Sequence, residues 1–173
     1  MNKVTIDFET YCEADIGNEG AWKYSLHPSL DVLCLAYAIN DGEVKIWRQY
    51  EGDELPYDLF DAIEDGYQIQ AWNVSFEYSI WENWCLKHSW PEIPLNSWFD
   101  IMSKAAAHSL PLGLMNACNA LDLPDEFHKQ EYGAEVLKKF SIPQKDGKRV
   151  LPHLIPVSAK NLYKYCMMDV VSE

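Results

Sequence analysis

Apolar residues in the first half of the chain fall into short runs that are separated by turn residues. Residues 3–9 open with Val4-Thr5-Ile6 and predict a first strand. Residues 31–39, which contain a long apolar run, and residues 43–48 predict two more strands, which are joined by the turn-like Asn40-Asp41-Gly42. The run at 31–39 is too short to span a bilayer, so it favours a buried strand and we expect no membrane segment.

The middle of the chain alternates between helix and strand patterns. Residues 56–65 place apolar side chains at helical spacing, and Gly66 lies where such a helix would end. Residues 68–72 predict a short strand. A helix is then expected from about Ser75, a plausible N-cap, to Lys87.

The second half predicts one more short strand, near 96–99, and several helices. Residues 141–157 hold three prolines and a glycine, and they are interpreted as a loop. We expect the helices at 100–109, 112–121, 126–140 and from Ser158 to the end. Five strands interspersed with helices predict an α/β fold, in which a mixed five-stranded sheet is flanked by helices.

Size and composition fit one domain. The chain has 173 residues, 48% of them hydrophobic, which is enough to bury a core. The final helix has no stop signal, so we expect residues 1–173 to be a single domain that was cut from a longer protein. Because an acidic motif begins at Asp7, we expect no signal peptide. Five cysteines without a C-x-x-C pair favour reduced thiols, and hence a cytoplasmic protein.

The net charge of −13 argues against a protein that coats nucleic acid, because such a protein needs a basic face. It does not argue against an enzyme that grips only the end of a strand. Metal ions in an acidic site would also supply positive charge where a phosphate lies.

Three acidic patterns lie along the chain in a fixed order. They are Asp7-Phe8-Glu9-Thr10, Asn73-Val74-Ser75-Phe76-Glu77 and Tyr165-Cys166-Met167-Met168-Asp169. On a strand the two carboxylates of the first pattern share a face, and on helices the polar pair of each later pattern does so too. Four carboxylates that converge on one point repel one another unless cations lie between them. The patterns therefore suit two divalent metal ions, the arrangement that serves phosphodiester hydrolysis.

These motifs resemble those of 3′–5′ exonucleases of the DEDD superfamily, whose fold is ribonuclease H-like. The match is to the tyrosine subclass, and it is closest to the N-terminal proofreading domain of phage-type, family A (polymerase I-like) DNA polymerases. It extends through Tyr24-Ser25-Leu26-His27-Pro28-Ser29 and Trp98-Phe99-Asp100-Ile101-Met102, and it covers nearly the whole chain. The resemblance implies a polymerase domain in the same longer chain and, if the protein is encoded by a phage, a place in the host cytoplasm.

The resemblance also implies a role for each site residue. Asp7, Glu9 and Asp169 would hold one metal ion, and Glu77 would reach the second. Mg²⁺ is the expected ion, with Mn²⁺ as a substitute. Glu9 and Tyr165 would orient the attacking water. The single-stranded 3′ end of DNA would be bound by Asn73, Phe76 and Thr10.

Each assignment has a structural alternative. Glu77, where the superfamily more often has Asp, could be an exposed helix carboxylate. Asn73 could be a cap or turn residue, and Tyr165 could fill the core. A basic cluster at Lys138, Lys139, Lys145, Lys148 and Arg149 could be a solvated helix end, or it could contact phosphates through Lys145, Lys148 and Arg149.

The sequence is also compatible with two other functions. One is a 3′–5′ exonuclease of the same superfamily that acts on RNA, since a tolerated 2′-hydroxyl cannot be read from the motifs. The other is a non-catalytic interaction module that has kept the fold. Retention of four carboxylates and the tyrosine argues against the second.

Overall fold

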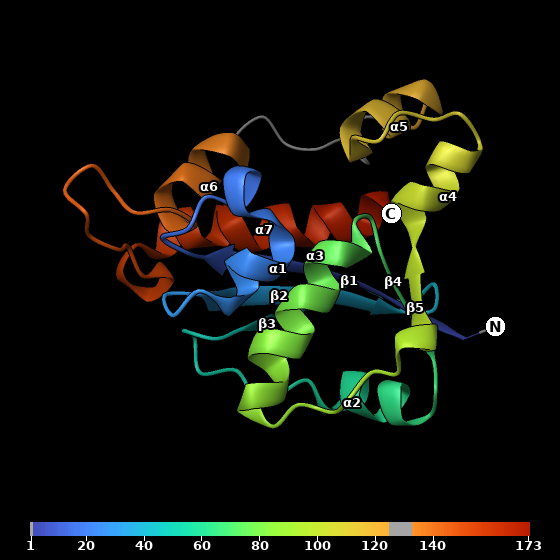
Figure 1. Ribbon diagram of the computed structural model, residues 1–173, viewed down its shortest axis with the longest axis horizontal. Helices are drawn as coiled ribbons and strands as arrows, with labels where there is room; N and C mark the ends of the chain where they lie inside the picture. Colours follow the sequence, from blue (N-terminus) through green and yellow to red (C-terminus); the bar gives the residue numbers. More distant parts are fainter. Residues whose placement is uncertain (1, 125–132) are drawn as a thin grey trace.

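The computed structural model describes residues 2–124 and 133–173, and its centre is a five-stranded mixed sheet (Figure 1). The strand order is β3-β2-β1-β4-β5. β1 (Lys3–Tyr11) runs antiparallel to β2 (Asp31–Ile39), which pairs in turn with β3 (Lys45–Arg48). On its other side β1 is parallel to β4 (Gln68–Ala71), and β5 (Trp98–Asp100) continues the parallel part. The predicted α/β class and the mixed five-stranded sheet are confirmed.

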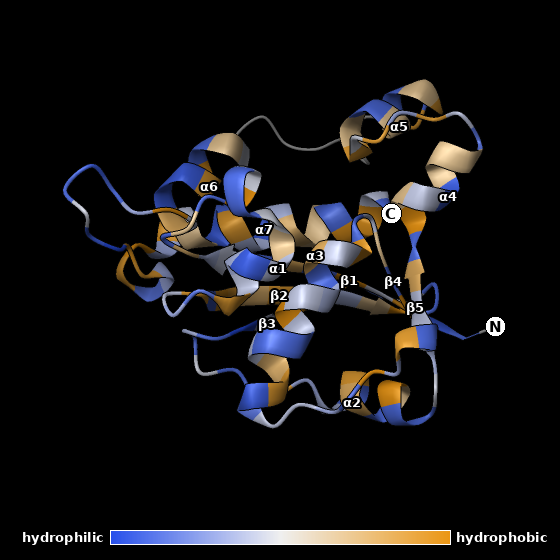
Figure 2. Cartoon of the chain, in the orientation of Figure 1, coloured by the Kyte–Doolittle hydropathy of each residue, from blue (hydrophilic) through white to orange (hydrophobic). Residues whose placement is uncertain are grey.

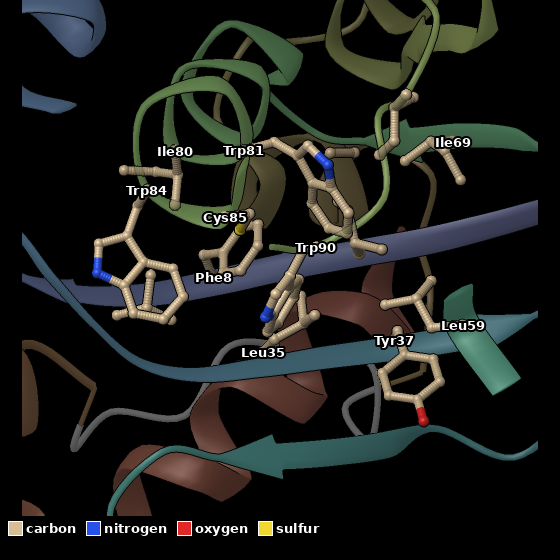
Figure 3. Packing of buried hydrophobic residues seen from close by; sticks show 14 of the residues in the cluster. Phe8, Leu35, Tyr37, Leu59, Ile69, Ile80, Trp81, Trp84, Cys85 and Trp90 are labelled. Atoms are coloured by element: carbon tan, nitrogen blue, oxygen red, sulfur yellow. The ribbon is translucent and has the colours of Figure 1, made fainter. Parts of the chain in front are cut away.

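One face of the sheet carries the larger apolar core. Val4, Ile6 and Phe8 of β1 are buried there, because alternate residues of a strand point to the same face. Helices α2 (Tyr57–Glu64) and α3 (Val74–Ile80) cover this face, and a π-helical turn at Trp81–Cys85 extends α3. Figure 3 shows how the tryptophans of this segment pack onto the strands.

The opposite face is covered by α6 (Gly133–Phe140) and α7 (Pro156–Ser172), which lie side by side (Figure 1). α7 packs along both β1 and β2. The Cys166 thiol donates to the Asp7 carbonyl oxygen at 3.3 Å, so the helix is fixed beside the middle of β1. The polar positions of β1, including Asp7 and Glu9, therefore lie on the face that α7 covers.

Shorter helical segments complete the fold at the edges of the sheet. α4 (Ile101–Ala107) follows β5, and α5 (Leu114–Ala120) comes next along the chain. 3-10 turns occupy Leu86–His88, Leu95–Ser97 and Pro152–Leu154. None of the helices in the described residues has the length and the apolar character needed to cross a membrane.

The structure differs from the sequence prediction in two segments. Helix α1 (Ile16–Leu26) was not predicted, because it is two short helical pieces joined at Gly20, whose φ is 76°, and it shows no apolar stripe. The helix expected from Ser75 to Lys87 begins at Val74 and changes to π and 3-10 geometry after Ile80. The first part of the helix expected at 126–140 lies outside the described residues.

The remaining boundaries follow the sequence patterns closely. Asn40 has the positive φ of 54° that the predicted turn requires. The segment after α6 is the predicted loop, and it is hydrophilic over most of its length (Figure 2). All five cysteines are buried and unpaired as disulfides, in agreement with the expectation of free thiols.

Trp81 should be the most costly core residue to truncate. Its side chain is 0% exposed, lies against Phe8 and Trp90, and donates to the Pro91 carbonyl oxygen at 2.9 Å. Trp81→Ala should lower the free energy of unfolding by about 3–5 kcal/mol, as measured by urea denaturation. Trp22→Ala is the matched control, since Trp22 is 49% exposed, and it should cost less than about 1 kcal/mol. Equal losses in both variants would contradict the core described above.

Candidate metal centre

Three carboxylates meet between β1 and α7. Ligand atoms of Asp7, Glu9 and Asp169 all lie within 4.8 Å of one another. Glu9 is 8% exposed and Asp169 is 6% exposed, so their charges are largely removed from water. The two-residue spacing on β1 puts Asp7 and Glu9 on the face toward α7. The sequence prediction that the first and third motifs converge thus agrees with the geometry.

An irregularity in the sheet lies beside Glu9. Glu9 pairs with Cys34 but Thr10 pairs with Val32, so β2 contributes Leu33 as an extra residue at this step. Such a bulge increases local twist and changes the direction of nearby side chains. The bulge thus lies directly beside Glu9, whose carboxylate faces α7.

Glu77 is on α3 and lies at the same end of the sheet as Asp7 and Glu9. β4 runs parallel to β1, so α3, which follows β4, begins at the edge where β1 carries its carboxylates. Glu77 is 4% exposed, and its Oε2 has no hydrogen-bond partner among the described residues. Burial and then the charge of Asp7 raise the pKa of the Glu77 carboxyl well above its ordinary value, with smaller effects from Asp100 and Asp169. Glu77 is therefore not the exposed helix carboxylate of the structural alternative.

A cleft of about 330 Å³ opens onto these carboxylates. Its lining includes Asp7, Glu77, Asp169, Asn73, Phe76 and Glu173. Glu173 was not anticipated from the sequence, although it lies four residues after Asp169, and that spacing on a helix was a signal available for finding it. Asp100 caps α4 by accepting from the Met102 N–H at 3.2 Å, as a local cap residue is expected to do.

Of the three residues predicted to bind the DNA 3′ end, Asn73 and Phe76 line the cleft and Thr10 does not. Asn73 is exposed beside the cleft, and its Oδ1 accepts from the Ser75 hydroxyl at 2.7 Å. Thr10 is 4% exposed, and its hydroxyl is 2.8 Å from that of Tyr24. Tyr24 also lies against Phe76, with ring centroids 6.1 Å apart. Thr10 thus supports the aromatic wall that includes Phe76, and it is not among the residues that line the cleft.

Tyr165 lies one helical turn before Asp169 and is 3% exposed. Its ring packs on the backbone at the start of α6, where a Cβ added to Gly133 would lie 2.1 Å from Tyr165 Cε2. Any side chain at position 133 would therefore clash with the Tyr165 ring where it now lies. The ring is held in place by close packing, which is what a hydroxyl with a positional role requires.

No residue of the basic cluster lines the cleft at the carboxylates. The Arg149 guanidinium forms an ion pair with Asp31 at 2.6 Å and lies 4.4 Å from the centroid of the Tyr11 ring. Lys148 is paired with Asp146 at 3.3 Å, and Lys145 is exposed on the same loop. Lys139 donates to the Ser158 hydroxyl at 2.8 Å. Arg149 thus has a structural role, while a phosphate contact by Lys145 and Lys148 stays a prediction.

Comparisons with known proteins agree with this picture. No family model matches the chain. The chain is 30% identical over 181 residues to a DNA polymerase of Bacillus phage SP02, and the match includes all of this chain and 27% of the polymerase. The chain thus spans about a quarter of the length of that relative.

A solved structure is also similar. The family B DNA polymerase from the hyperthermophilic archaeon Pyrobaculum calidifontis matches with a TM-score of 0.59 over 99% of this chain and 23% of that chain. At 16% sequence identity this likeness concerns the fold alone. The five-stranded mixed sheet flanked by helices is a ribonuclease H-like arrangement, and the predicted fold class is confirmed. The chain is similar to one part of longer DNA polymerases.

The raised pKa of Glu77 predicts how stability depends on pH without metal. The folded state binds this proton more tightly than the unfolded chain does, so stability is fully present below the ordinary pKa of a glutamate, about 4.3, and is lost as the pH rises above it. Glu77→Gln should reduce this loss when urea denaturation is followed in chelator from about pH 5 to pH 8. The exposed Glu64→Gln is the control and should leave the slope unchanged. A steeper loss in Glu77→Gln would contradict the description of the site.

The contact of Gly133 with Tyr165 gives a second prediction. Gly133→Ala should lower the free energy of unfolding by about 1–3 kcal/mol, because the new methyl group overlaps the buried ring. Gly113→Ala is a matched control, since its Cβ would approach only the Asn116 side chain, at 3.3 Å. Urea denaturation of both variants measures the difference. Equal stability of the two variants would show that Tyr165 is not held in this way.

Proposed function

We propose that this chain is a divalent-metal-dependent 3′–5′ exonuclease that removes nucleoside 5′-monophosphates from DNA 3′ ends. The observation that carries the proposal is the approach of Asp7, Glu9 and Asp169 to within 4.8 Å, with buried Glu77 beside them. The similarity to a phage DNA polymerase supports a proofreading role within a longer polymerase chain.

The donor set fits hard divalent cations. Carboxylate oxygens are the ligands that Mg²⁺ and Mn²⁺ prefer. Burial, and after it the negative charge of Asp7, raises the pKa of the Glu77 carboxyl, and a cation in the cleft would offset both effects. When bound, two such ions would lower the pKa of a water molecule and stabilise the departing 3′ oxygen. Asp7, Glu9 and Asp169 would hold one ion, and Glu77 with Asp7 would hold the other.

The chain's own residues would position the reactants. Glu9 and the Tyr165 hydroxyl would orient the attacking water toward the phosphorus. Phe76 forms part of the cleft wall and would contact the terminal nucleotide, while Asn73 at the cleft edge would hold its phosphate or sugar. A cleft of about 330 Å³ suits one or two nucleotides of a single strand rather than a duplex end. A frayed, mismatched terminus is therefore the preferred substrate in this proposal.

A 5′-labelled single-stranded DNA tests the proposal directly. With Mg²⁺ the protein should shorten the DNA one nucleotide at a time from its 3′ end, and chelator should stop the reaction. Asp7→Ala should reduce the rate by at least about 10³-fold, because it removes the carboxylate that would be shared between the two ions. The exposed Asp41→Ala is the matched control and should keep the wild-type rate.

The outcomes separate this proposal from its rivals. Faster shortening of a ribo-oligonucleotide of the same sequence would identify an RNA exonuclease instead. No shortening of either oligonucleotide, together with no binding of Mn²⁺, would indicate a non-catalytic module. Near wild-type hydrolysis by Asp7→Ala would exclude the proposed site.

A further inference from the structure

We infer that Glu173 is a fifth carboxylate of the centre and a ligand to the second divalent cation, on the side of the cleft where Glu77 lies. The inference rests on the proposed function, because it assumes a metal centre, and it extends that function by a residue outside the three motifs. The three motifs supply four carboxylates, and Glu173 would add a fifth that lies outside the motifs.

The position of Glu173 on α7 directs its side chain into the cleft. Glu173 lies four residues after Asp169, and its N–H donates to the Asp169 carbonyl oxygen at 3.2 Å, so the helical turn is maintained to this point. Residues four apart on a helix share a face. The Glu173 side chain accordingly lines the same cleft as Asp7, Glu77 and Asp169.

The Glu173 carboxylate has one hydrogen-bond donor, and one of its oxygens is without a partner among the described residues. It accepts a hydrogen bond from the backbone N–H of Trp72, while its Oε2 is buried and has no hydrogen-bond partner among the described residues. The Trp72 peptide is itself fixed, because its carbonyl accepts from the Met102 N–H at 3.0 Å. The Trp72 indole donates to the Leu112 carbonyl oxygen at 2.7 Å. A rigid donor therefore holds one end of the carboxylate and leaves the other available to a ligand.

A purely structural role does not explain this arrangement. A glutamate that only closed the end of α7 would turn its second oxygen to water or to a donor, because a buried carboxylate oxygen without a partner costs free energy. Here the neighbouring charges are the carboxylates of Asp7, Glu77 and Asp169, which add repulsion. A cation in the cleft would offset both costs.

The geometry also separates Glu173 from the first metal position. Among the described residues, the carboxylates whose ligand atoms lie within 4.8 Å of one another are Asp7, Glu9 and Asp169, and neither Glu77 nor Glu173 belongs to that group. Glu77 and Glu173 each have a buried Oε2 that no described residue contacts by a hydrogen bond. Asp7 and, more weakly, Asp169 act electrostatically on both Glu77 and Glu173, so the two groups of carboxylates lie next to each other.

Titration of Mn²⁺ into the full-length protein tests the assignment. Isothermal titration calorimetry should give two sites in the wild type. Glu173→Gln keeps an oxygen for the Trp72 N–H but loses the charge, and it should weaken the second site by about tenfold or more while leaving the first unchanged. The exposed Glu64→Gln is the matched control and should bind Mn²⁺ as the wild type does.

A second readout does not depend on activity. The melting temperature of Glu173→Gln without metal should equal or exceed that of the wild type, because one negative charge leaves the crowded cleft, and Mn²⁺ should raise it less than in the wild type. Two unchanged Mn²⁺ sites in a folded Glu173→Gln would overturn the role of Glu173 and leave the proposed function intact. A wild-type protein that binds no Mn²⁺ would overturn both.

Discussion

Asp7 and Glu9 lie two residues apart on a strand whose opposite face is packed in the main core, and this fixed spacing determines where the other elements of the site must lie. The parallel pairing of β1 with β4 brings the start of α3, and with it Glu77, to the same edge of the sheet. The contact of Cys166 with the Asp7 carbonyl sets α7 along β1, so that Asp169 completes the group. The carboxylates are thus held by rigid elements and not by loops, which is the placement that accurate metal coordination requires.

Crowded carboxylates have a cost that the fold has to offset. Burial disfavours the ionised forms of Glu77 and Glu173, and the charges of the neighbouring carboxylates add to this, so the pKa of each of these two carboxyls is raised. The large aromatic core on the other face of β1, with fully buried Trp81 at its centre, supplies stabilisation that is independent of metal. Such a site stores repulsion in the metal-free protein and makes binding of divalent cations favourable.

The sequence predicted the sheet well because its strands carry strong local signals. The run at 32–39 is apolar throughout, and the strand at residues 3–9 alternates between core and polar positions. Periodicity placed Asp7 and Glu9 on one face of a strand, whereas their convergence with Asp169 was implied by the resemblance of the motifs to those of DEDD exonucleases. Helix α1 escaped notice because Gly20 divides it into two short pieces without an apolar stripe. The ion pair of Arg149 with Asp31 could not be predicted from the sequence, because that partner lies 118 residues away along the chain.

The neighbours of Glu173 are determined by tertiary packing, and the sequence motifs do not reveal them. Its spacing from Asp169 is visible in the sequence, but the same spacing fits any solvent-facing helix carboxylate. What distinguishes it is the Trp72 N–H, which becomes a neighbour only when β4 ends beside α7. The Trp72 peptide lies directly before Asn73, the first residue of the second motif, so the anchor of Glu173 and the start of the α3 segment are coupled through one rigid turn. A change in the position of that turn would affect both Glu77 and Glu173, so the proposed second metal position depends on this turn as well as on the Asp7 carboxylate that it would share with the first.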